Sequence, residues 1–272
     1  MPLRCRSSRT LQAGNAYVQR ADWIADLAPD FEAEVTARDG NLVRVVVALR
    51  RADGAVARYR LTIDASKPIL SVRETKPEQL PAFCPERHIN HDGGFCITWQ
   101  PGAPLQVTTP EEAGAWWATL LGFLWLQQRA ARLRRWPGDL AWAHGDAARA
   151  QRDAELAASA LGARYVRALA RRRLSVTKKN VGHFLELRDN GRWLYAVWEG
   201  ARRVATLGQP CLCGNKRVQL RACGNHAQAA ADLVFALERW RTEEEDFWRE
   251  QRGKPCCGTM DDCPLARQAK AA

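Results

Sequence analysis

The sequence lacks the features that mark a secreted or membrane-bound chain. Its first ten residues, MPLRCRSSRT, contain no apolar core of the length that a signal peptide needs. The least polar stretch, residues 113–128, is uncharged but contains two glutamines and is too short to span a membrane, which favours a buried helix. There is also no internal repeat. We therefore expect a cytoplasmic globular protein with no membrane partner.

Composition narrows the class further. With 272 residues, 46% of them hydrophobic and 26% charged, the chain can bury one core and a second, smaller one. Nine unevenly spaced cysteines in a reducing compartment favour metal binding or catalysis over disulfides. The net charge of +11 favours acidic partners. The basic runs at 129–135 and 164–179 are equally consistent with solvated helix surfaces.

The first half of the chain predicts a helix, an antiparallel meander and a second helix. Asp39-Gly40 and Asp53-Gly54 separate alternating runs, which is typical of hairpins. Thr109, followed by proline and two acidic residues, predicts a sharp helix start. The expected elements are a helix over 15–29, strands over 31–37, 42–50, 55–64 and 69–73, an irregular loop over 76–108, and a helix over 110–134. We expect Trp116, Leu120, Leu121 and Leu124 to be buried against the sheet.

The second half predicts a smaller α+β region. Residues 147–173 are expected to be helical, residues 183–207 to form short strands around an Asn190-Gly191 turn, and residues 227–251 to form a long helix. The expected division is a first domain over 15–145, a helix-and-hairpin linker or accessory region over 146–209, and a cysteine-rich region over 210–272. The fold class is therefore α+β.

One loop contains the residues expected to carry chemistry. In residues 84–99, CPERHINHDGGFCITW, two glycines allow a tight turn immediately before Cys96. His88, His91 and Asp92 lie close by in sequence, and an imidazole or a dipole can lower the pKa of a thiol. Cys96 is thus the candidate nucleophile. Each of these residues alone also has a non-catalytic interpretation, because a lone cysteine is usually a small buried apolar residue and a loop histidine usually faces solvent. Cys84, His88, His91 and Cys96 together are an alternative zinc site.

This arrangement resembles the ubiquitin-conjugating enzyme family, and its bacterial members in particular, over residues 15–145. That family has an N-terminal helix, a four-stranded meander, a loop with His-Pro-Asn followed by Asp/Asn-Gly-x-(Ile/Val)-Cys-Leu, and a crossing helix. Here the loop reads PERH at 85–88 and DGGFCI at 92–97. The family's asparagine position holds His88, its preceding proline is replaced by Arg87, and Asn90 is two residues out of register.

The resemblance implies transthiolation. Cys96 would accept a ubiquitin-like modifier as a thioester from an activating enzyme and pass it to an amine or other acceptor on a protein. His88 would take the asparagine's place as an oxyanion donor. Because of the changed motif, a catalytically inactive adaptor of the same fold is the alternative. The family context also hints at a role in antiviral defence.

The C-terminal cysteines predict structural zinc. Residues 211–226, CLCGNKRVQLRACGNH, resemble a SEC-C motif and offer four ligands that suit tetrahedral zinc. These candidates are Cys211, Cys213, Cys223 and His226. Cys256, Cys257 and Cys263 form a second group of candidate metal ligands. They could complete the first site or form a separate one. The alternatives are that they supply a second nucleophile or bind nothing.

A basic nucleic-acid-binding zinc protein is the remaining alternative. The net charge, the arginine runs, and Trp193, Tyr195 and Trp198 as candidates for base stacking favour it. The basic runs, however, do not coincide with the cysteine cluster. Nucleic acid is therefore not the expected partner.

Overall fold

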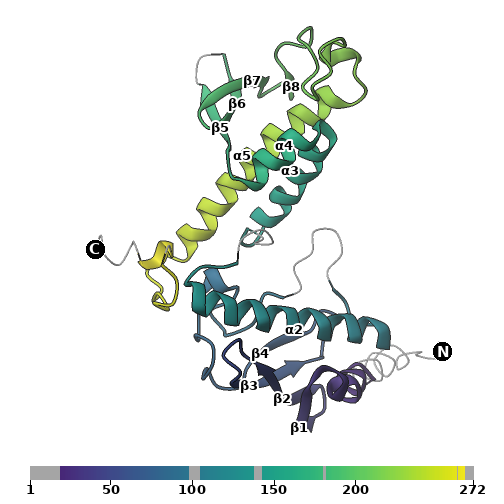
Figure 1. Ribbon diagram of the computed structural model, residues 1–272, viewed down its shortest axis with the longest axis vertical. Helices are drawn as coiled ribbons and strands as arrows, with labels where there is room; N and C mark the ends of the chain where they lie inside the picture. The colour runs from purple at the N-terminus through teal and green to yellow at the C-terminus, as the bar shows by residue number, and fades with distance from the viewer. Residues whose placement is uncertain (1–18, 98–104, 138–142, 180–181, 262, 267–272) are drawn as a thin grey trace, which may run out of the picture. The chain divides into compact units, whose positions relative to one another are not determined.

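The chain divides into two compact units, which are described separately. The computed structural model describes residues 19–97, 105–137, 143–179, 182–261 and 263–266. Unit 1 comprises residues 1–138 and 253–272, and unit 2 comprises residues 139–252 (Figure 1). The described helices include none that is both long and apolar enough to cross a membrane.

Unit 1 is built on a four-stranded antiparallel meander in the order β1-β2-β3-β4. Its strands are β1 (Ala33–Asp39), β2 (Leu42–Arg50), β3 (Val56–Asp64) and β4 (Ser71–Glu74). Helical residues 19–27 and the 3-10 turn η1 (Ala28–Phe31) precede the sheet. The turn between β1 and β2 has only two residues, and Gly40 adopts a φ of +54° there, which suits a residue without Cβ.

Alternation along β2 and β3 places one face of the sheet in the core. Val43, Val45 and Val47 of β2 are buried, and their intervening neighbours are more exposed. Leu61 and Ile63 continue the buried face on β3. Because side chains alternate with a period of two, this register places these apolar side chains on the one face of the sheet that a helix covers.

Helix α2 (Pro110–Leu133) crosses the sheet (Figure 1). It begins with a capping box, in which the Thr109 side chain accepts from the Glu112 N–H and the Glu112 side chain accepts from the Thr109 N–H. Trp116, Leu120 and Leu124 are fully buried in the same cluster as the strand residues, and Leu121 is partly buried against it. The predicted α+β fold, with helix, meander, loop and crossing helix, is confirmed.

Unit 2 combines helices with a second four-stranded antiparallel sheet, ordered β5-β6-β7-β8. Its elements are α3 (Ala147–Leu161), α4 (Ala163–Ala170), β5 (Leu174–Lys179), β6 (Phe184–Asp189), β7 (Arg192–Trp198), β8 (Arg203–Val204), η4 (Leu220–Ala222) and α5 (His226–Glu250). Asn190 and Gly191 both adopt positive φ values, 49° and 79°, as a type I′ hairpin requires.

Two details of unit 2 differ from the sequence expectation. Gly162, with a φ of +106°, divides the helical region expected over 147–173 into α3 and α4. Residues 174–179 form β5, although no strand was predicted there. The strand pairs with β6 over its whole length, so long-range ladder hydrogen bonds stabilise a basic segment with weak local alternation.

Leu120→Ala should loosen unit 1 specifically. Truncating a fully buried leucine costs about 2–5 kcal/mol, because apolar burial is lost and a cavity remains. Hydrogen-exchange mass spectrometry should show faster exchange in β2 and β3 peptides, while α5 peptides, in the other unit, serve as an internal reference. Trp125→Ala, at an exposed position on the same helix, is the matched control and should change exchange little. Equal effects of the two variants would contradict the packing described.

Candidate functional site

The loop after β4 is held as a small ladder against the edge of the meander. Isolated bridges pair Cys84 with Ile89, Ile89 with Phe95, and Arg73 of β4 with Gly94. The Phe95 N–H donates to the Val72 carbonyl at 2.8 Å. The sheet edge therefore fixes the path of the backbone into Cys96.

Alternation within this ladder turns Cys96 outward. Phe95 is buried, and its ring stacks on Phe123 of α2 at a centroid distance of 5.1 Å. Its neighbour Cys96 is exposed. Gly93, with a φ of +78°, and Asp92, whose Oδ1 accepts from the Gly94 N–H at 2.9 Å, form the tight turn before it. A bulky thioester can reach the sulfur.

The electrostatic setting of Cys96 differs from the expectation. Although its side chain is exposed, surrounding protein removes enough water to raise the pKa of the Cys96 thiol above its ordinary value. The loop histidines do not offset this desolvation. The raised pKa favours the protonated thiol at neutral pH, so Cys96 would have to lose a proton before its exposed sulfur could act as a nucleophile.

His88 meets Cys96 through its backbone. The His88 carbonyl accepts from the Cys96 N–H at 2.8 Å, and the His88 ring packs edge-on against Trp136 at 4.7 Å. His88 ends the 3-10 turn η2 (Pro85–Arg87) with a φ of 54°. The structure thus places the His88 backbone next to that of Cys96, and the role of His88 as an oxyanion donor stays a prediction.

Arg87 anchors the loop, a role that sequence reasoning missed. It is only 3% exposed, and its guanidinium donates to the Gln127 side-chain oxygen at 2.8 Å and to the Gln127 carbonyl at 3.2 Å. Gln127 returns a hydrogen bond to the Arg87 carbonyl. A third contact joins Arg87 to Thr259 Oγ1 at 3.4 Å. The guanidinium therefore ties the loop to α2 and to the C-terminal tail.

A thiol pair lies next to this anchor. The sulfurs of Cys84 and Cys257 are 2.9 Å apart, and Thr259 Oγ1 lies 3.1 Å from the Cys257 sulfur. The contact is oriented with the Cys257 Sγ as donor to Cys84, but burial argues for the opposite proton position, because Cys84 is 1% exposed whereas Cys257 is only half-buried. A charge is less costly on Cys257, so we assign the thiolate to it.

The pKa values of the pair follow from that assignment. Hydrogen bonding from Cys84, with smaller help from Thr259 and from the positive charge of Arg87, lowers the pKa of Cys257 to about 5. Hydrogen bonding to the Cys257 thiolate and burial both raise the pKa of Cys84. The pair thus supplies the buried Arg87 guanidinium with a nearby negative charge.

The other tail cysteines also belong to unit 1. Cys263 is buried, and burial together with the neighbouring Cys256 raises its pKa to about 11. Arg134 at the end of α2 pairs with Asp261 and donates to the Gly258 carbonyl. The assignment of Cys256, Cys257 and Cys263 as metal ligands stays a prediction, since the contact that the structure shows is with Cys84.

A second site lies in unit 2, where Cys211, Cys213, Cys223 and His226 converge. Their ligand atoms all lie within 4.8 Å of one another, and they form the one such group found among the described residues. The Cys211 sulfur is 3.2 Å from His226 Nδ1, and the Cys213 and Cys223 sulfurs are 4.0 Å apart. The group can hold a metal ion. By contrast, the alternative loop site around Cys84 and Cys96 is not assembled.

Local structure explains why these four side chains meet. Cys211 and Cys213 lie on a turn closed by the hydrogen bond from the Cys211 N–H to the Val218 carbonyl at 2.9 Å. Cys223 ends η4, and His226 is the first residue of α5. A backbone N–H from Asn215 lowers the pKa of Cys213, which favours a thiolate ligand.

Comparison with known families assigns both halves. The family described as a prokaryotic E2 domain matches residues 31–138, and the family described as a cysteine-rich domain C-terminal to the E2 domain matches residues 143–265. The chain is a prokaryotic E2-like protein with a C-terminal cysteine-rich region. Curated proteins and solved structures yield no significant match. Cys96 lies in the E2-like match, and the Cys₃His group lies in the cysteine-rich one.

The two thiols of the E2-like protein should differ in the pH at which they become reactive. Alkylation requires the thiolate. The rate of iodoacetamide labelling at Cys257 should reach half its plateau near pH 5, whereas the labelling rate at Cys96 should still rise above pH 8.5. Peptide mass spectrometry between pH 4 and 10 resolves the two sites. A midpoint near 8.5 at Cys257 would refute the thiolate assignment.

Proposed function

We propose that this E2-like protein is a transthiolating conjugating enzyme with Cys96 as its nucleophile. The observation that carries the proposal is an exposed cysteine, held by a ladder to the β4 edge, within a prokaryotic E2 domain. Its partners would be a ubiquitin-like modifier, an activating enzyme and an acceptor protein, in the bacterial cytoplasm. A role in antiviral defence is part of the same proposal.

The chemistry needs a proton acceptor at the first step. The Cys96 thiol loses its proton as the sulfur attacks the carbonyl of the modifier thioester, and the tetrahedral intermediate then expels the thiolate of the activating enzyme. Because the pKa of Cys96 is raised, the departing thiolate is the natural acceptor of that proton. An acceptor amine then attacks the new thioester and releases Cys96 as a thiol.

His88 is proposed to act in the second step. The His88 carbonyl already accepts a hydrogen bond from the Cys96 N–H, so that N–H is not available to an oxyanion. A side-chain donor is therefore needed, and the His88 ring, which packs against Trp136 and occupies the family's asparagine position, would supply it. Its contribution would be electrostatic and greatest in the transition state.

The experiment is reconstitution with activating enzyme, ATP and modifier. Wild type should form a thiol-sensitive adduct, Cys96→Ala should form none, and Cys96→Ser should yield a more stable ester. Cys256→Ser is the matched control and should still form the adduct, because it removes a tail thiol but leaves Cys257 beside Arg87 in place. An adduct on Cys257 in the Cys96→Ala variant would place the nucleophile in the tail and defeat the proposal.

The discharge step of the same assay tests His88. His88→Ala should load normally but discharge to a lysine acceptor roughly 10²-fold more slowly, the loss expected when one oxyanion donor is removed. His88→Asn should recover part of that rate because its amide can donate. Equal discharge by wild type and His88→Ala would assign the residue to packing alone.

We also propose that the Cys₃His group binds structural zinc. With Zn–S bonds of about 2.3 Å, a tetrahedral site has S–S edges of roughly 3.8 Å. The 4.0 Å separation of Cys213 and Cys223 fits this value. Three thiolates and an imidazole leave no open position, so the ion would stabilise the fold and take no part in transfer.

Metal analysis of the purified chain tests this assignment. Wild type should contain about one zinc per chain, and Cys211→Ser with Cys213→Ser should lose it and unfold unit 2, because metal binding and folding are coupled. Cys256→Ser with Cys263→Ser is the matched control and should retain one zinc. A metal-free wild type that stays folded, or zinc lost in the control, would contradict the assignment.

A further inference from the structure

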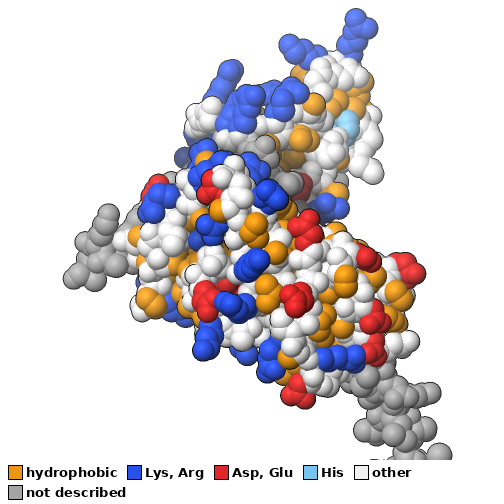
Figure 2. Space-filling view, turned by 60° about the horizontal axis from the view of Figure 1, so that its bottom comes forward, with side chains coloured by type: hydrophobic (Ala, Val, Ile, Leu, Met, Phe, Trp, Pro, Cys, Tyr) orange, Lys and Arg blue, Asp and Glu red, His pale blue; other side chains and the backbone are white. Residues whose placement is uncertain are grey.

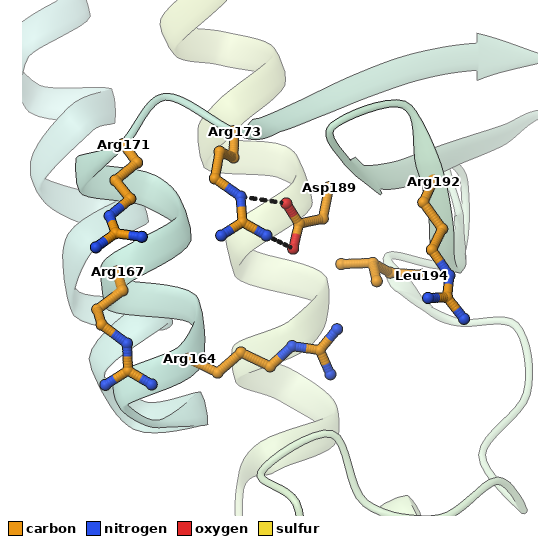
Figure 3. A pocket seen from close by; sticks show the side chains of 7 residues that line it. All are labelled: Arg164, Arg167, Arg171, Arg173, Asp189, Arg192 and Leu194. Atoms are coloured by element: carbon orange, nitrogen blue, oxygen red, sulfur yellow. Dashed lines mark hydrogen bonds and ion pairs between the residues drawn. The ribbon is translucent and has the colours of Figure 1, made fainter.

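Unit 2 contains an arginine-lined pocket that thioester transfer does not use. It has a volume of about 310 Å³ and opens between α4 and the β6–β7 hairpin (Figure 3). Its lining is Arg164, Arg167, Arg171, Arg173, Asp189, Arg192 and Leu194. Figure 2 shows Lys and Arg side chains gathered on unit 2 at the top of the view.

The one carboxylate of the lining is already engaged. Arg173 donates to both oxygens of Asp189, at 2.8 and 2.7 Å, in a bidentate pair that joins the residue before β5 to the end of β6 (Figure 3). The Asp189 side chain is only 10% exposed. This pair is structural, and it leaves the other arginines of the pocket without a carboxylate partner among the described residues.

The unpaired arginines are placed at a cost to the local structure. Arg164, Arg167 and Arg171 follow one another at spacings of three and four, so like charges share one face of α4 and its C-cap. Arg164 is in the first turn, where the helix dipole disfavours a positive charge. Arg192 adds a further charge from the start of β7. Apart from Asp189, which pairs with Arg173, no acidic side chain of the described residues lines the pocket.

The shape and chemistry of the pocket favour a phosphate. Guanidinium groups present paired N–H donors that match phosphate oxygens, and several arginines can share one doubly charged group. The volume is at the lower end of the range for small-molecule pockets, which suits a phosphate with one attached ring. Leu194 supplies an apolar contact beside the arginines.

We propose that this pocket binds the phosphate of a nucleotide, either free or within a nucleic-acid strand. The recognised chemistry is the same in both cases: arginines hold the phosphate, and Leu194 contacts the sugar or base. The proposal is independent of thioester transfer, because the pocket residues lie in the cysteine-rich unit and Cys96 lies in the other. Binding should therefore be unchanged in Cys96→Ala.

The experiment measures binding of AMP, ATP and a fluorescein-labelled single-stranded 12-mer to the zinc-loaded full chain. Arg164→Gln with Arg167→Gln should weaken binding at least tenfold. Arg132→Gln with Arg135→Gln is the matched control, since it removes the same charge from exposed positions in unit 1, and it should change affinity less than threefold. Arg192→Gln probes the pocket from the opposite side and covers a folding defect in the α4 variant.

The nucleotide and oligonucleotide measurements distinguish a free nucleotide from a nucleic-acid strand as the source of the phosphate. Tight AMP or ATP binding that is lost in the pocket variant supports a free nucleotide. Oligonucleotide binding that shows the same loss and a steep salt dependence supports a strand. Equal loss in the pocket and control variants, or no binding by any phosphate probe, overturns the proposal. A poly-glutamate peptide that binds through the pocket when the phosphates do not would overturn it in favour of an acidic protein partner.

Discussion

A positive charge that folding removes from water organises the loop of the E2-like domain. A buried guanidinium is tolerated only when its donors and its charge are both satisfied. Arg87 meets the first need through Gln127 and Thr259, and the second through the thiolate of Cys257. Removing one partner of a buried charge set typically costs about 3–5 kcal/mol. The loop carrying Cys96 therefore starts from a fixed point rather than from a flexible turn.

The surroundings of Cys257 and Cys96 shift the pKa values of the two thiols in opposite directions. Cys257 has hydrogen-bond donors and a nearby cation, so it ionises readily, but it is half-buried and engaged with Cys84. Cys96 is accessible but desolvated, so its pKa rises. A raised pKa protects an exposed thiol from oxidation and alkylation, since both need the thiolate. It also makes the Cys96 thiolate, once formed, more basic and therefore intrinsically more nucleophilic.

Local signals predicted much of this structure. The Asp39-Gly40 and Asn190-Gly191 turns, the Thr109 cap and the alternation in β2 and β3 act within a few residues, and all are found as elements. The meeting of Cys211 with His226 was similarly readable from spacing. Strand β5 and the break at Gly162 could not be predicted from local signals. Strand β5 depends on pairing with β6, and a single glycine within a helical pattern does not by itself show that a helix ends there.

Contacts between distant parts of the chain could not be read in this way. Cys84 and Cys257 are separated by 173 residues, and Arg87 and Thr259 by 172. No residue near Arg87 in the sequence indicates that its side chain is buried, so in the sequence Arg87 stands out only as a departure from the family motif. The arginine pocket was visible only as a basic run, because the engagement of Asp189 by Arg173 depends on the β6–β7 hairpin.

These distant contacts also define the functional domain. Residues 253–261 and 263–266 pack with unit 1, although all of unit 2 intervenes in the chain, and Met260, Cys263 and Leu265 are buried there. An E2-like domain cut after residue 138 would keep its sheet and α2 but lose the thiolate that faces Arg87. Arg87 would then lose its Thr259 contact and one of its nearby negative groups, within the loop that carries Cys96. The tail therefore packs as part of unit 1, although the cysteine-rich family match extends to residue 265, and in the chain unit 2 lies between two segments of one compact unit.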